Sequence, residues 1–93
     1  MLEKAALTPA SRVELTPGFR LQWEPAQQAH VLLYPEGMVT LNESATEVLK
    51  RCDGRPLAEL LADLQVDYPG AELEADVFEF MEMARDQGWL RIS

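Results

Sequence analysis

The sequence predicts an α+β domain in which a three-stranded antiparallel sheet is followed by three helices. Two observations support this prediction. Three segments between residues 19 and 41 have the alternating or apolar character of strands, and the apolar residues after residue 42 recur at helical spacing. A sheet of three strands must bury one face, and the helices are available to cover it. In its proportions, the helical half resembles a winged helix-turn-helix.

Length and composition indicate one small domain. The chain has 93 residues, of which 47% are hydrophobic. Residues 1–17 mix Pro, Ser, Thr and scattered charges without periodicity, so we expect a mobile tail before a folded domain over 18–93. The N-terminus lacks the basic start and apolar block of a secretory signal, and no apolar run of about 18 residues occurs. We therefore expect a cytoplasmic protein without a membrane span.

The three predicted strands differ in their patterns. Residues 19–24 alternate apolar and polar side chains, which is typical of a half-buried strand, with Phe19, Leu21 and Trp23 on one face. Residues 30–34 are apolar on both faces, as in a central strand. Pro35 and Gly37 predict a three-residue hairpin loop that leads into a third strand over 38–41.

The three predicted helices have marked ends. Asn42 is suited to cap the first helix, and Ser44 with Glu47 forms an alternative capping box. Gly54 is expected to end this helix. The second helix begins near Pro56 and ends at Pro69-Gly70. The third covers residues 72–88 and has an acidic first turn, which the helix dipole favours. Residues 89–92 are expected to be extended.

The third strand is predicted to be an open edge of the sheet. The strand over 19–24 is protected by charged residues and by Pro25, whereas the strand over 38–41 contains neither charge nor proline. An extended peptide could pair with this edge through main-chain hydrogen bonds, beside apolar side chains of the third helix. The candidate peptide-binding residues are Met38, Val39, Thr40 and Leu41 on the strand and Val77, Phe80, Met81 and Ala84 on the helix.

Two alternatives to peptide binding remain open at this level. Most apolar strands and helical stripes are core, and an open edge can also pair with a second copy of the same strand, so the protein is a monomer or an edge-paired homodimer. A winged-helix transcription regulator is the other alternative. The net charge of −8 argues against it, because phosphate backbones would be repelled, and it favours a partner of basic character.

No catalytic or metal-binding motif is evident, so we expect neither an enzyme nor a bound metal or cofactor. His30 is the one histidine and has no second histidine with which to form a dyad or a metal site. Cys52, the one cysteine, occupies an apolar position of the first helix and is expected to be a buried thiol. Neither a glycine-rich phosphate loop nor a nucleophile motif occurs.

Four segments, taken in order and at their spacing, resemble a known family. They are FRLQWE (19–24), LLYPEGMVTLNESATEVLKRCDG (32–54), DYPG (67–70) and DVFEFMEMARDQGWL (76–90). Together they resemble the pyrroloquinoline quinone biosynthesis protein D (PqqD) family from about residue 19 to residue 90. The sequence departs from the family at Pro56, where members often have Ser or Thr.

The resemblance implies a chaperone-like module that does not catalyse a reaction. Members of the family bind the small ribosomally made precursor peptide and present it to a radical S-adenosylmethionine enzyme. The family is the namesake of the PqqD-like domains that recognise peptides in many peptide-modifying pathways. These domains are called RiPP recognition elements. These commonly hold the leader peptide as an added strand beside the third strand and against the third helix. The resemblance therefore implies the same site as the open edge.

Overall fold

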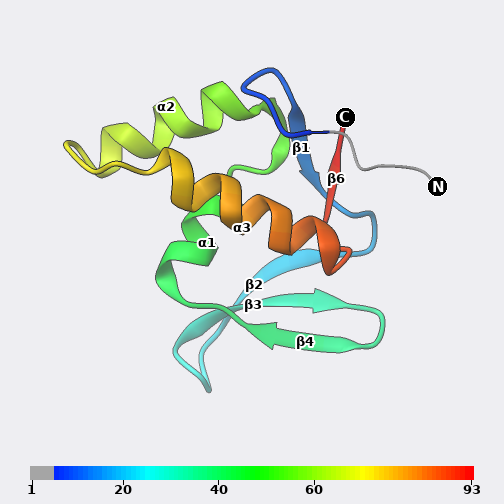
Figure 1. Ribbon diagram of the computed structural model, residues 1–93. Coiled ribbons are helices and arrows are strands. Elements are labelled where there is room, and N and C mark those ends of the chain that lie inside the picture. The colour runs from blue at the N-terminus through cyan, green and yellow to red at the C-terminus, as the bar shows by residue number, and fades with distance from the viewer. Residues whose placement is uncertain (1–5) are drawn as a thin grey trace.

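The computed structural model describes residues 6–93, and the predicted meander is present (Figure 1). Three antiparallel strands form one sheet in the order β2-β3-β4, so β4 pairs with β3 alone. The loop before β4 has two residues rather than the predicted three, because Tyr34 pairs with Gly37. The strands are β2 (Arg20–Glu24), β3 (Ala29–Tyr34) and β4 (Gly37–Thr40).

The three predicted helices are also present, which confirms the α+β class. They are α1 (Glu43–Leu49), α2 (Leu57–Asp67) and α3 (Glu74–Asp86). Asn42 is the cap of α1, and its side chain accepts a hydrogen bond from the backbone N–H of Ala45 at 2.7 Å. Pro56 precedes α2 in an extended conformation and has no side-chain cap. Helix α1 ends at Leu49, before the glycine that was expected to stop it.

A second sheet, which the sequence did not reveal, joins distant parts of the chain. Its three antiparallel strands have the order β5-β1-β6, with β1 (Arg12–Leu15) in the centre. The edge strands are β5 (Asp53–Pro56) and β6 (Leu90–Ile92). Strand β6 confirms the predicted extended close of the chain, whereas β5 was not predicted.

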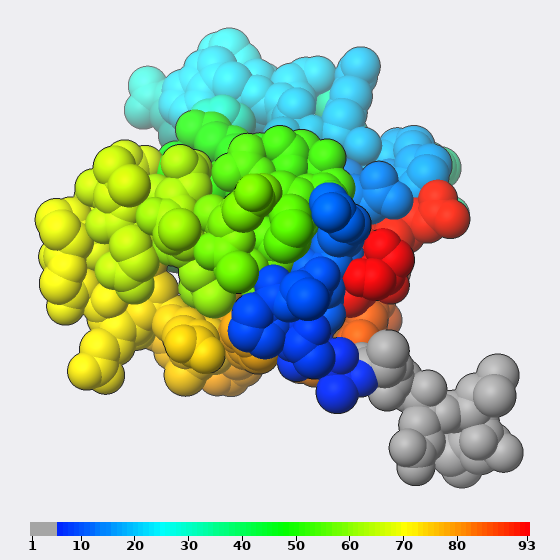
Figure 2. Space-filling view, turned by 90° about the horizontal axis from the view of Figure 1, so that it is seen from above, coloured from blue at the N-terminus to red at the C-terminus, as the bar shows by residue number. Residues whose placement is uncertain are grey.

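The prediction of a mobile tail over residues 1–17 is wrong for the segment that forms β1. Val13 is fully buried, and β1 makes ladders with strands from the middle and the end of the chain. The backbone N–H groups of Leu57 and Ala58 donate to the carbonyls of Ser11 and Pro9. Figure 2 shows this blue N-terminal segment against the green residues that precede and begin α2. Residues 1–5 of the predicted tail lie outside the described residues.

One hydrophobic core connects both sheets and the three helices. Its largest fully buried side chains come from β1, β3 and all three helices, and α1 packs directly against β3 of the meander. They include Leu32, Leu49, Leu57, Leu60 and Met81. Among the described residues, no helix is long and apolar enough to cross a membrane.

Candidate functional site

The outer edge of β4 has main-chain groups that point away from its sheet. The backbone N–H of Leu41 donates to the carbonyl of His30 at 2.9 Å, and Val31 faces Thr40 in the register. Hydrogen-bonded pairs alternate along an antiparallel ladder, so Val39 and Leu41 direct their N–H and C=O groups toward β3. Met38 and Thr40 direct theirs outward. No other strand in the described part of the chain pairs with this edge.

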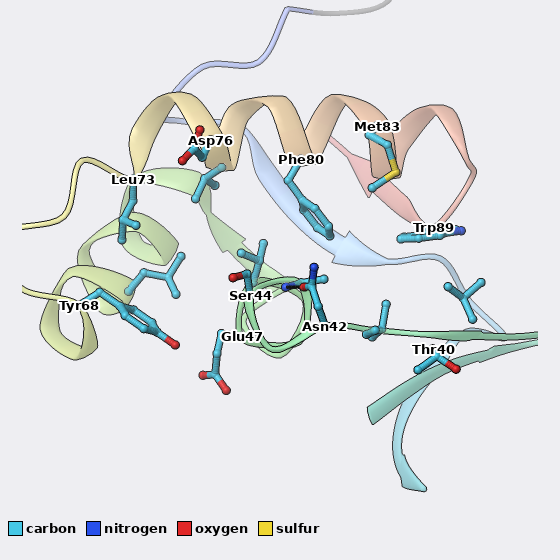
Figure 3. A pocket seen from close by; sticks show the side chains of 16 residues that line it. Thr40, Asn42, Ser44, Glu47, Tyr68, Leu73, Asp76, Phe80, Met83 and Trp89 are labelled. Carbon is cyan, nitrogen blue, oxygen red and sulfur yellow. Dashed lines mark hydrogen bonds between the residues drawn. The ribbon is translucent and has the colours of Figure 1, made fainter. Parts of the chain in front are cut away.

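A groove of about 490 Å³ lies beside β4, between α1 and α3 (Figure 3). Tyr68, at the end of α2, lies at one end of the groove, and Trp89 lies at the other with Met83 above it. Phe80 points from α3 toward the start of α1. The apolar lining is Val39, Leu41, Ala45, Val48, Leu64, Leu73, Val77, Phe80, Met83 and Trp89.

The charges in the groove lie toward its Tyr68 end. The carboxylates of Asp76 and Glu47 are on this side, whereas apolar groups form the Trp89 end (Figure 3). Hydrogen bonds from Arg51 and Lys50 hold the pKa of Glu47 below its ordinary value, so this carboxylate stays charged near neutral pH. The groove therefore has an apolar end and an acidic end.

Arg51 joins two of the helices that contribute residues to the groove, α1 and α2. Its side chain is only 10% exposed, and it contacts Glu47 on α1 at 3.0 Å and Asp67 on α2 at 2.7 Å, with Asp63 as a third partner. Although burial disfavours its charge, hydrogen bonds to Glu47 and Asp63 raise the pKa of Arg51. The charge-assisted bonds to three carboxylates tie α1 to α2.

Comparison with known proteins identifies the family. Residues 29–90 match the family described as Coenzyme PQQ synthesis protein D (PqqD). This chain belongs to the PqqD family. A PqqD-family relative named PqqA binding protein, from Azotobacter vinelandii, is 51% identical over 81 residues, which cover 85% of this chain and 88% of the relative. A relative of the same name from Stutzerimonas stutzeri is 53% identical over 77 residues, which cover 81% of this chain and 84% of the relative.

A solved structure has the same fold as this PqqD-family chain. It is the solution NMR structure of the PqqD truncation of Methylobacterium extorquens PqqCD, described as a functional and stand-alone RiPP recognition element. The two chains are 28% identical, with a TM-score of 0.76 and coverage of 92% of this chain and 95% of the other. The resemblance seen in the sequence is thus confirmed.

The structure brings five of the eight candidate peptide-binding residues to the groove. Met81 and Ala84 are fully buried in the core and do not line it, while Met38 is 48% exposed and lies outside it. The five that line the groove are Val39, Thr40, Leu41, Val77 and Phe80. The apolar side chains of α3 therefore divide between two faces, one toward the core and one toward the groove.

The candidate residues named from the sequence did not include Met83 or Trp89. Met83 lies off the helical stripe of Val77, Phe80, Met81 and Ala84, yet it lines the groove and is 39% exposed. Trp89 follows α3 and lies at the end of the groove (Figure 3). The available signal was the spacing of Leu73, the N-cap of α3, and of Val77, Phe80 and Met83 within the helix, because residues three or four apart share a helix face.

Proposed function

We propose that this PqqD-family chain is a non-catalytic carrier of the precursor peptide of pyrroloquinoline quinone biosynthesis. The single observation behind the proposal is the open edge of β4 beside the apolar groove. The names of its relatives, PqqA binding protein, and the fold it shares with a RiPP recognition element support the same role. The family assignment also favours peptide binding over a winged-helix regulator of transcription.

In this role the peptide adds a strand to the meander. The outward N–H and C=O groups of Met38 and Thr40 would pair with its backbone, which gives affinity with little dependence on side chains. Apolar peptide side chains would enter the groove against Phe80 and Met83 and set the register. The remaining candidates have different roles. Val39, Leu41 and Val77 line the groove, whereas Met81 and Ala84 support its wall from the core.

The bound peptide is then presented to a radical S-adenosylmethionine enzyme in the cytoplasm. A free peptide samples many conformations, and holding it extended removes much of the entropy cost of placing it in an active site. The carrier itself needs no cofactor for this task. Binding and presentation are the whole of its contribution to the reaction.

Titration of ¹⁵N-labelled protein with the precursor peptide tests the proposal. We expect shifts of the amide signals of Met38 and Thr40, of α3, and of the indole N–H of Trp89. Shifts confined to β2, on the opposite edge of the meander, would contradict the proposed site. Light scattering with and without peptide distinguishes this carrier from a homodimer that pairs through β4, because a dimer of that kind would dissociate when peptide binds.

A further inference from the structure

A second hollow lies on the other side of α1 from the groove. It has a volume of about 310 Å³, and we call it the Trp23 hollow. Glu43, Thr46 and Glu47 face it from α1, whereas Ser44, Ala45 and Val48 of the same helix face the groove. At 3.6 residues per turn these two sets occupy different sides of the helix, although Glu47 borders both hollows. The other lining residues are Trp23, Gln28, Ala29, His30 and Leu41.

Trp23 leaves half of its surface exposed in this hollow. It pairs across the sheet with His30, and the two rings meet edge to face with centroids 5.3 Å apart. Trp23 is on the apolar face of its strand, which the alternating pattern predicted to be the buried one, yet 51% of its surface is exposed. The edge-to-face contact with His30 favours this orientation of the indole, which forms an aromatic wall of the hollow.

The wall formed by α1 is acidic. Glu47 is already paired with Lys50 and Arg51. Glu43, in the first turn of α1, forms no hydrogen bond or ion pair with any residue in the described part of the chain. Among the described residues that line the hollow, none is Lys or Arg. Glu43 is therefore the carboxylate available to a cation from outside.

We propose that the Trp23 hollow receives an arginine side chain of a protein partner, separately from the peptide in the groove. A guanidinium group stacks on an aromatic ring and can form two parallel hydrogen bonds with a carboxylate, which suits a hollow with Trp23 and Glu43 in its walls. The net charge of −8 attracts a basic surface over a longer range. The inference does not depend on peptide binding, because Trp23 and Glu43 line only this hollow, although Leu41 and Glu47 border both sites.

The two tryptophans of the chain allow each site to be observed separately. Trp23 lines this hollow and Trp89 lines the groove, so their indole N–H signals in ¹⁵N NMR report on different sites. The probe is the tripeptide acetyl-Gly-Arg-Gly-amide, and its control has citrulline, which is uncharged, in place of arginine. We expect the arginine peptide to shift the Trp23 signal saturably and to leave the Trp89 signal in place. The citrulline peptide should give no saturable shift.

Substitution of the acidic wall completes the test. Glu43→Gln keeps the size of the side chain and should weaken binding at Trp23 at least fivefold. Asp76→Asn removes a carboxylate from the groove instead and should leave that binding unchanged. Equal responses to both peptides, or affinity at Trp23 unaffected by Glu43→Gln, would overturn the proposal.

The precursor peptide is the remaining probe. It tests whether the arginine comes from a protein other than the precursor peptide itself. It should shift Trp89 and not compete with the arginine peptide for Trp23; competition would assign the hollow to the same peptide and overturn the proposal. If Trp89 does not respond to the precursor peptide, only the proposed carrier function fails.

Discussion

The backbone N–H of Leu41 donates to the carbonyl of His30, and this one bond determines which groups of β4 point outward. Leu41 belongs to the set of residues that face β3, so Thr40 belongs to the set that faces the open edge. Alternate residues of β4 therefore bond to β3, and the backbone groups of the residues between them are available to a partner strand.

Replacement of Thr40 by proline should weaken peptide binding without unfolding the sheet. Proline lacks an N–H, and at this position that N–H points away from β3. We expect affinity for the precursor peptide to fall at least tenfold in calorimetric titration, with native circular dichroism. Thr40→Val, which removes only the hydroxyl that bonds to Gln27, should bind as the parent does. Val39→Pro should instead destabilise the domain, because that N–H faces β3.

Phe80→Ala should reduce peptide affinity through the loss of apolar contact in the groove. Phe80 is partly buried and points into the groove from α3. Aromatic side chains in such pockets commonly dominate binding, so we expect a loss of about tenfold or more, or about 1.4 kcal/mol. The matched control is Val66→Ala on α2, where the side chain is 76% exposed and outside the groove. Equal affinities for the two variants would contradict the assignment of the groove.

Arg51→Ala should destabilise the domain by about 2 kcal/mol in urea unfolding. This is less than for a fully buried ion pair, because Asp63 and Asp67 are half exposed. The substitution leaves three carboxylates near one another without their shared cation. Arg55→Ala is the comparison variant, since its pair with Asp53 is more exposed, and a clearly smaller loss is expected there. Similar losses would exclude a special role for Arg51 in joining α1 to α2.

Cys52 should not react with thiol reagents while the domain is folded. Burial raises the pKa of its thiol to about 12, so almost no thiolate is present at pH 8. Labelling with iodoacetamide should therefore follow unfolding and accelerate in urea.

The same pKa shift predicts how stability depends on alkaline pH. An unfolded Cys52 ionises near its ordinary pKa of 9.0, whereas the folded one stays neutral. The stabilisation is thus fully present below pH 9 and is lost as the pH rises toward about 12. Cys52→Ala should flatten this decline in a series of thermal melts. An equally steep decline in the variant would show that other groups cause it.

The elements that the sequence determined are those with a local signal. Alternation over residues 19–24, the apolar run before Pro35 and the helical spacing after Asn42 each reflect contacts within one element or between neighbours in the chain. These signals were sufficient to predict the meander, the order of its strands and the open edge at β4. Asn42 capped its helix as predicted because a cap acts over only three residues.

Tertiary structure alone decided the second sheet and the division of side chains between core and groove. Strands β1, β5 and β6 have three or four residues each, so each segment is too short for an alternating pattern to be recognised. They come from distant parts of the chain, so no local signal predicts their pairing. Met81 is buried and Met83 lines the groove because of where α3 packs. Trp23 is half exposed because a hollow lies between its side chain and α1. Periodicity identifies a helix face, but only packing determines what that face meets.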